Sequence, residues 1–158
     1  CVERSSSVYD TDPVGEVPGQ SPFLNACLSV RTALEPLALL DLAKRTERAL
    51  GRAEGGPRHG PRPIDIDILM LGDEELAHER LRLPHEELLR RRFVLIPALE
   101  LDFSMRTPAG ERLADALAAL GLDEGVRYAG PPLAVGGGVA MTSANGGAHA
   151  QSAASRQL

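Results

Sequence analysis

Residues 60–71 read Gly-Pro-Arg-Pro-Ile-Asp-Ile-Asp-Ile-Leu-Met-Leu. From Ile64 the pattern alternates, which predicts a β-strand with Ile64 and Ile66 on one face and Asp65 and Asp67 on the other. The two carboxylates lie about 6–7 Å apart along such a strand. With an effective dielectric near 20, their repulsion is on the order of 3 kcal/mol. The pair therefore predicts a counter-charge, and its oxygen ligands suit a hard divalent cation such as Mg²⁺.

An alternative interpretation is an edge strand that turns its polar face toward water. The apolar character of residues 68–71, Ile-Leu-Met-Leu, is more typical of a central strand, and this favours the metal site. A loop rich in glycine and proline, residues 51–62, leads directly into the strand and carries Arg52, Arg58 and Arg62. Guanidinium groups bind phosphates, so basic side chains next to paired carboxylates indicate a polyphosphate–metal site. A soluble linker is the competing interpretation of the loop.

The composition of the chain limits the classes of protein to which it can belong. The 158 residues suit one domain, and 43% apolar residues are enough for a core. A net charge of −5 argues against a general binder of nucleic acids or membrane surfaces, and an aromatic content of 3% argues against a base-stacking platform. Two cysteines form no disulfide framework, which favours a reducing compartment. We therefore expect a cytoplasmic protein that binds small molecules rather than nucleic acid or membrane.

Strands and helices alternate along the chain. Strands are predicted over residues 2–9 and 23–32, a long loop over 10–22, and a helix from Pro36 that ends at Gly51. After a turn at Gly72-Asp73, a short hairpin arm is predicted over 74–76 and brief alternation over 80–85. Helices are predicted over 86–92 and 112–120, and an apolar run over 93–96 that Pro97 ends or kinks. From Ala129 the composition collapses to Gly, Ala, Ser and Pro, which predicts a disordered tail.

At residues 58–68 the chain resembles the 6-hydroxymethyl-7,8-dihydropterin pyrophosphokinase (HPPK) family. The family signature reads roughly [KR]-W-G-P-R-x-x-D-[LIV]-D-[IL], and here it stands as Arg-His-Gly-Pro-Arg-Pro-Ile-Asp-Ile-Asp-Ile. Further similar segments occur in the right order over about residues 2–128. They are Ser6-Ser7-Val8-Tyr9 with Thr11, Pro13 and Gly15; Phe23-Leu24-Asn25; Leu83-Pro84-His85; Arg91-Arg92-Phe93-Val94-Leu95-Ile96-Pro97; and Val126-Arg127-Tyr128.

The resemblance implies an α+β, ferredoxin-like α/β sandwich that transfers pyrophosphate from ATP to the hydroxymethyl group of the pterin and releases AMP. It implies that two Mg²⁺ ions bind Asp65 and Asp67, and that the protein is a monomer. The remaining implied site residues are Val14, Asn25 and Phe93 for the pterin, Arg52, Arg62 and Arg91 for catalysis on the phosphates, and Glu47, Arg62, Arg80 and His85 for ATP.

Against the family pattern, the first strand and helix are absent before Val2, a tryptophan is replaced by His59, and Glu54 stands where a basic residue is common. We therefore expect an N-terminally incomplete catalytic domain over residues 1–128 and a disordered tail over 129–158. An alternative function is a non-catalytic, ferredoxin-like remnant that binds pterin, nucleotide or a partner chain. A metal-dependent phosphohydrolase is a more distant alternative.

Overall fold

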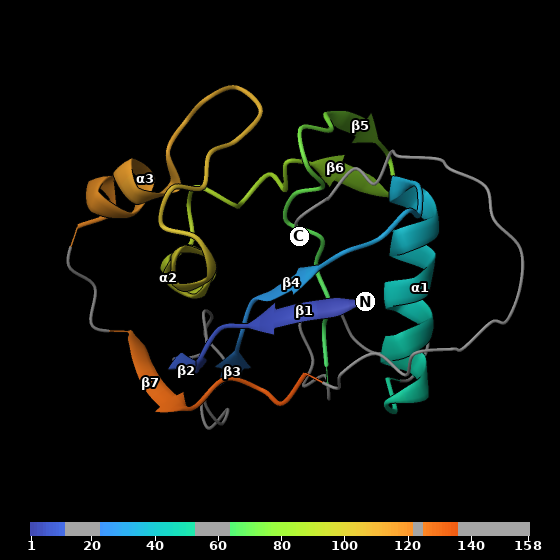
Figure 1. The fold of residues 1–158 in the computed structure, drawn as a ribbon, viewed down its shortest axis with the longest axis horizontal. Helices are drawn as coiled ribbons and strands as arrows, with labels where there is room; N and C mark the ends of the chain where they lie inside the picture. Colours follow the sequence, from blue (N-terminus) through green and yellow to red (C-terminus); the bar gives the residue numbers. More distant parts are fainter. Residues whose placement is uncertain (12–22, 53–63, 122–124, 136–158) are drawn as a thin grey trace, which may run out of the picture.

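The computed structural model describes residues 1–11, 23–52, 64–121 and 125–135. Seven strands and three helices occur within these ranges, and every ladder is antiparallel. The strands form three small sheets, β1-β4, β3-β2-β7 and β5-β6. This is an α+β fold of the ferredoxin-like type, as predicted. Figure 1 shows α1 on one side of β1 and β4, and α2 and α3 on the other.

The bounds of the elements agree in part with the predictions. The strands are β1 Val2–Ser5, β2 Val8–Thr11, β3 Phe23–Asn25, β4 Leu28–Val30, β5 Leu76–His78, β6 Leu81–Leu83 and β7 Val126–Gly130, and the helices are α1 Pro36–Ala49, α2 Arg92–Leu101 and α3 Leu113–Ala119. Proline opens α1 as predicted, and Gly51 follows its end with a φ of 97°. Gly121, with a φ of 74°, similarly follows α3.

Two predicted strands are each divided in two. The strand predicted over residues 2–9 is broken at Ser6-Ser7, and the strand over 23–32 is broken at Ala26-Cys27. The breaks lie opposite each other, because the Ser6 backbone N–H donates to the Cys27 carbonyl and the Cys27 N–H donates to Ser6 Oγ, both at 2.8 Å. At this point the chain leaves the β1-β4 sheet for the β3-β2-β7 sheet. The buried Ser6 hydroxyl takes the place of a backbone ladder contact at this change of sheet.

The predicted helix over residues 86–92 is wrong. Residues 86–90 form turns, and the helix begins at Arg92 and continues through Pro97 to Leu101. Pro97 removes one hydrogen bond from the helix interior, but this residue is fully buried. Burial of α2 therefore outweighs the cost of the proline.

Two apolar clusters hold the elements together. The first joins α2 and α3 to Met70, Leu88 and Cys27. The second joins α1 to β6 and to Ile68 and Leu71. Residues 64–71 contribute to both clusters, and Figure 1 shows this segment passing between α1 and α2. Its burial alternates as predicted from Ile64 to Met70, with Asp65 and Asp67 exposed, but Leu71 is buried next to Met70.

The prediction of a regular strand over residues 64–71 is wrong, because no described segment forms a ladder with them. Their backbone bonds elsewhere instead: the Ile66 N–H donates to Glu47 Oε1 at 2.7 Å, and the Leu69 carbonyl accepts the His85 N–H at 2.8 Å.

The C-terminal boundary also needs a correction. β7 includes Ala129 and Gly130, which the composition assigned to the disordered tail, and it pairs with β2. Residues 136–158 lie outside the described ranges. The loop over 12–22 and residues 53–63 lie outside them as well.

Candidate functional site

The carboxylates of the site are presented on the exposed side of residues 64–67. Asp65 and Asp67 are exposed, whereas Ile66 between them is partly covered and Ile68 is buried at 3% exposure. The buried isoleucines fix the segment against α1, and the aspartates consequently face outward. Within the described part of the chain, Asp67 has no ion-pair partner.

Glu47 fixes the position of this segment from beneath. Its side chain is only 1% exposed, although it is an acid. Oε1 accepts hydrogen bonds from the Ile66 N–H at 2.7 Å and from Lys44 Nζ at 2.8 Å, and Oε2 accepts one from Arg52 Nη1 at 2.5 Å. Two cations and a backbone donor therefore compensate the burial of the carboxylate. The structure places Glu47 beneath the residue between the two aspartates.

Arg52 links this buried carboxylate to the exposed one. The same Nη1 lies 2.5 Å from Glu47 Oε2 and 2.6 Å from Asp65 Oδ1. The hydrogen bond with Asp65 is the main cause that raises the pKa of Arg52 above its ordinary value. Lys44 lies 3.7 Å from Asp65. Two basic side chains of the protein therefore supply a counter-charge to Asp65.

The donor set fits Mg²⁺ that is shared with a substrate. Among the described residues, no group of three or more histidine, cysteine, aspartate or glutamate side chains could hold a metal ion by itself. Mg²⁺ typically binds one or two carboxylates together with substrate phosphates and water. Asp65 and Asp67 match that pattern, whereas a cage made of protein ligands alone would need more carboxylates.

The other predicted phosphate-binding residues lie on separate elements. Arg80, in the β5-β6 turn, forms an ion pair with Asp41 of α1. His85 donates its backbone N–H to Leu69, which ties the segment after β6 to residues 64–71. Its Nδ1 accepts the Glu87 N–H at 3.1 Å, which restricts the orientation of the ring.

Arg91 lies directly before α2, and its guanidinium carbon is 5.7 Å from the centroid of the Phe93 ring. Such a contact holds the ring and the cation together. The Phe93 ring is only partly covered, so it keeps surface on which a flat ligand could stack. Arg62 and Val14, which were also predicted as site residues, lie outside the described residues.

Asn25 is placed at the end of β3, in the register opposite Tyr9 of β2. Its Nδ2 donates to Thr11 Oγ1 at 2.8 Å and to the Phe23 carbonyl at 3.2 Å. Phe23 lies two residues before Asn25 on the same strand and therefore shares its face. The Phe23 side chain is 41% exposed. Its exposed position next to Asn25 could have been predicted from the period of two along the strand.

The sheet that carries Asn25 is anchored to α2 by Glu100. This carboxylate accepts hydrogen bonds from the Ser7 backbone N–H at 2.9 Å, from Ser7 Oγ at 2.7 Å and from the Tyr9 hydroxyl at 3.1 Å. Burial raises the pKa of Tyr9, and the contact with Glu100 raises it further. The contact fixes β2, and with it the neighbouring strand β3, relative to the helix that carries Phe93.

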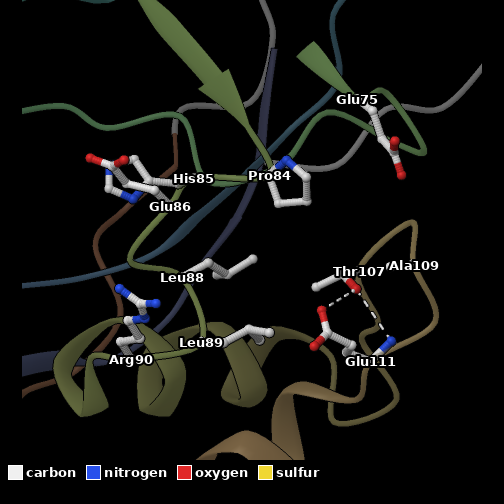
Figure 2. Close-up of a pocket in the computed structure, with 10 residues that line it drawn as sticks. All are labelled: Glu75, Pro84, His85, Glu86, Leu88, Leu89, Arg90, Thr107, Ala109 and Glu111. Carbon is white, nitrogen blue, oxygen red and sulfur yellow. Dashed lines mark hydrogen bonds between the residues drawn. The ribbon is translucent and has the colours of Figure 1, made fainter. Parts of the chain in front are cut away.

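A cavity of about 450 Å³ lies away from these carboxylates. Figure 2 shows it between residues 84–90 and the loop that contains Thr107 and Glu111, whose side chains are hydrogen-bonded to each other at 3.3 Å. Of the predicted site residues that the structure describes, only His85 lines it. We therefore do not assign the site to this cavity.

These features of the fold and the site define a class of protein. The chain is a ferredoxin-like α+β protein with two exposed aspartates, of which Asp65 lies against Lys44 and Arg52. The Asn25 amide and the Phe23 and Phe93 rings lie on β3 and α2, which pack together. No helix in the described ranges is both long and apolar enough to cross a membrane.

Comparison with known proteins identifies the family. The model of the family described as 7,8-dihydro-6-hydroxymethylpterin-pyrophosphokinase (HPPK) matches residues 1–103. The chain belongs to this family. The match includes the aspartate pair, Glu47, Arg52, Asn25 and Phe93, and it ends before α3 and β7.

Individual relatives have similar names. A 2-amino-4-hydroxy-6-hydroxymethyldihydropteridine pyrophosphokinase from Pseudomonas aeruginosa is 40% identical over 115 residues, which cover 72% of this chain and 69% of that protein. The Bacillus subtilis protein of the same name is 42% identical over 100 residues, 63% of this chain and 59% of the relative. A folate synthesis bifunctional protein from Arabidopsis thaliana is 44% identical over 100 residues, 63% of this chain and 20% of the relative. The chain thus spans well under two thirds of the length of several curated relatives.

Proposed function

We propose that this chain transfers pyrophosphate from ATP to the hydroxymethyl oxygen of 6-hydroxymethyl-7,8-dihydropterin and releases AMP. The observation that carries the proposal is the exposed pair Asp65 and Asp67, held beside Arg52 in a chain of the HPPK family. In this reaction the hydroxymethyl oxygen forms a bond to the β-phosphorus of ATP. The bond between that phosphorus and the oxygen of the AMP leaving group breaks, and the hydroxymethyl proton is released.

The residues of the chain divide this task between two regions. Asp65 and Asp67 would hold two Mg²⁺ ions, which neutralise charge on the phosphate oxygens when they are bound. Arg52, Arg62 and Arg91 would orient the phosphates as planar donors. The remaining proposed contacts are Glu47, Arg80 and His85 for ATP, and Val14, Asn25 and Phe93 for the pterin.

The buried network explains why a positioned aspartate pair matters here. Glu47 accepts the Ile66 N–H, so the backbone between the two aspartates is tied to a buried carboxylate. Orientation of this kind lowers a barrier because the ligands need no rearrangement during the reaction. The phosphates of bound ATP would compete with Asp65 for Arg52, and this carboxylate would then be one of the residues that hold the metal.

A direct assay tests the proposal. The chain is incubated with ATP, Mg²⁺ and the dihydropterin, and AMP and the pterin diphosphate are quantified by chromatography. We expect equal amounts of the two products, and loss of at least about a hundredfold in turnover for Asp67→Asn, because a charge contact to the transferring group is removed. Asp73→Asn, an exposed aspartate in the turn at Gly72, is the matched control and should retain full turnover.

The products of this assay distinguish the proposed transfer from the alternative functions. ATP hydrolysis without pterin diphosphate would contradict the proposed transfer. Binding of both ligands without any turnover by a folded chain would instead favour the non-catalytic binding module. The cytoplasmic location stays a prediction, since some relatives are named as mitochondrial proteins.

A further inference from the structure

Lys44 is the only lysine of the chain, in which every other long basic side chain is an arginine. It lies on α1, three residues before Glu47, and its Nζ is 2.8 Å from Glu47 Oε1 and 3.7 Å from Asp65 Oδ1. A lysine ammonium is a compact charge with three donors on a flexible stem, so this one group can serve two carboxylates. None of the roles proposed above uses Lys44.

Lys44 and Arg52 share the same two acids. Arg52 Nη1 lies 2.5 Å from Glu47 Oε2 and 2.6 Å from Asp65 Oδ1, so each carboxylate lies near both cations. The two cations approach Glu47 through different oxygens, Lys44 through Oε1 and Arg52 through Oε2. If one cation leaves, the other therefore still pairs with the buried carboxylate.

The proposed function takes one of these cations away from Glu47. In it, Arg52 turns to the phosphates of ATP. Glu47 is only 1% exposed, so water has little access to replace Arg52, and a buried carboxylate without a cation is costly. Among the described residues, Lys44 is then the one cation left in contact with Glu47. Its contact preserves the acceptor that holds the Ile66 N–H between the two aspartates.

We infer that Lys44 is a positioning residue, which keeps Glu47 paired and residues 65–67 in place while Arg52 binds the phosphates of ATP. This inference rests on the proposed function, in which ATP is a substrate. Lys44 does not touch the nucleotide in this arrangement. Its removal should therefore weaken nucleotide binding, but it should disturb the ligand-free protein little, because Arg52 compensates Glu47 there.

Lys44→Met and Lys44→Arg test the inference. Methionine keeps a flexible, unbranched side chain without the charge, and arginine keeps the charge. Dissociation constants for a non-hydrolysable ATP analogue with Mg²⁺ are measured by calorimetry. Lys44→Met should weaken binding about tenfold, the value of one hydrogen bond to a charged group, and Lys44→Arg should weaken it less than about threefold. Arg45→Met, which removes an exposed cation from the next position of α1, is the matched control and should bind like the wild type.

A double-mutant cycle separates positioning from a direct contact between Lys44 and phosphate. In a Glu47→Gln background there is no buried charge for Lys44 to compensate, so the further change Lys44→Met should alter the affinity less than about twofold. If Lys44 binds the phosphates directly, Lys44→Met weakens binding equally in both backgrounds. That result would overturn the inference.

Urea unfolding without ligand supplies a second readout. Lys44→Met should shift the midpoint of unfolding much less than Glu47→Ala does, because Arg52 still pairs with Glu47 in the ligand-free chain. A lysine that only stabilises the fold would give the opposite pattern, a large shift of the midpoint and an unchanged affinity of the folded protein for the ATP analogue. This pattern would also overturn the inference.

Binding by the wild type distinguishes failure of the inference from failure of the proposed function. If the wild type binds the ATP analogue and Lys44→Met binds it equally well, Arg52 does not need to leave Glu47, and the inference is overturned while the proposed function stands. If the folded wild-type chain binds no ATP analogue at all, the proposed function fails and the inference fails with it.

Discussion

Removal of the Glu47 carboxylate should destabilise the protein more than removal of any exposed acid. The side chain is 1% exposed and has three donors, two of them cationic. Glu47→Ala leaves the Ile66 N–H without its acceptor and leaves Lys44 and Arg52 without their shared anion. The loss of one partner of a buried ion pair typically costs about 3–5 kcal/mol.

The exposure of the two basic partners narrows this range of the loss in stability. Lys44 and Arg52 are 35% and 22% exposed, so both can recover part of the loss through water and through Asp65. The Ile66 N–H has no such alternative. We therefore expect Glu47→Ala to lower the free energy of unfolding by about 3 kcal/mol, the lower end of that range. Glu47→Gln should cost about 1–2 kcal/mol, because its amide oxygen can still accept from Ile66.

Urea unfolding monitored by circular dichroism measures both changes. Asp41→Ala is the control on the same helix: Asp41 pairs with Arg80, and both side chains are nearly half exposed. That variant should lose less than about 1 kcal/mol. If Glu47→Ala unfolds at the same urea concentration as Asp41→Ala, the buried network does not hold residues 64–67 in place, and the reasoning about the aspartate pair is refuted.

Three further predictions concern single side chains. Arg52→Ala should increase the affinity for Mn²⁺ without nucleotide about fivefold, the value of one surface ion pair with Asp65, as measured by electron paramagnetic resonance; an unchanged affinity would contradict the contact. Burial raises the pKa of Cys27 to about 12, so only one of the two thiols should react with a thiol reagent at pH 8 until the protein is unfolded. Hydrogen bonds from Ser104 hold the pKa of Asp102 below its usual 3.8; this stabilisation is present above that value and lost as the pH falls through the lower native pKa, and Ser104→Ala should raise the pKa in a carboxyl NMR titration.

Much of the fold could be predicted from local patterns. Pro36 and Gly51 mark the two ends of α1 because a proline and a glycine have fixed conformational preferences there. The alternation over residues 64–70 correctly predicted which side chains are more buried, whereas Leu71, assigned to the aspartate face, is fully buried as well. It could not predict the hydrogen bonds, because these depend on segments distant in the sequence, such as Glu47 and His85.

The candidate site, like the fold, could be predicted from the sequence only in part. Asp65, Asp67 and Arg52 could be associated from their spacing and charge, and the structure brings Arg52 and Asp65 together. The hydrogen bond between Asn25 and Thr11 could not be predicted, because it exists only when β2 and β3 pair. Likewise, α2 passes through Pro97 because burial outweighs the helix-breaking tendency that the sequence displays.

The pairing of β2 with β7 has a consequence for how the chain acquires its structure. The ion pair between Arg127 and Asp10 closes a separation of 117 residues. Contacts this distant in sequence form slowly, because the ends of a long loop must meet before any hydrogen bond between them can form. On a ribosome, β2 and β3 emerge long before their partner. The sheet that carries Asn25 is therefore completed last, and until β7 is synthesised one edge of β2 stays open to incorrect partners.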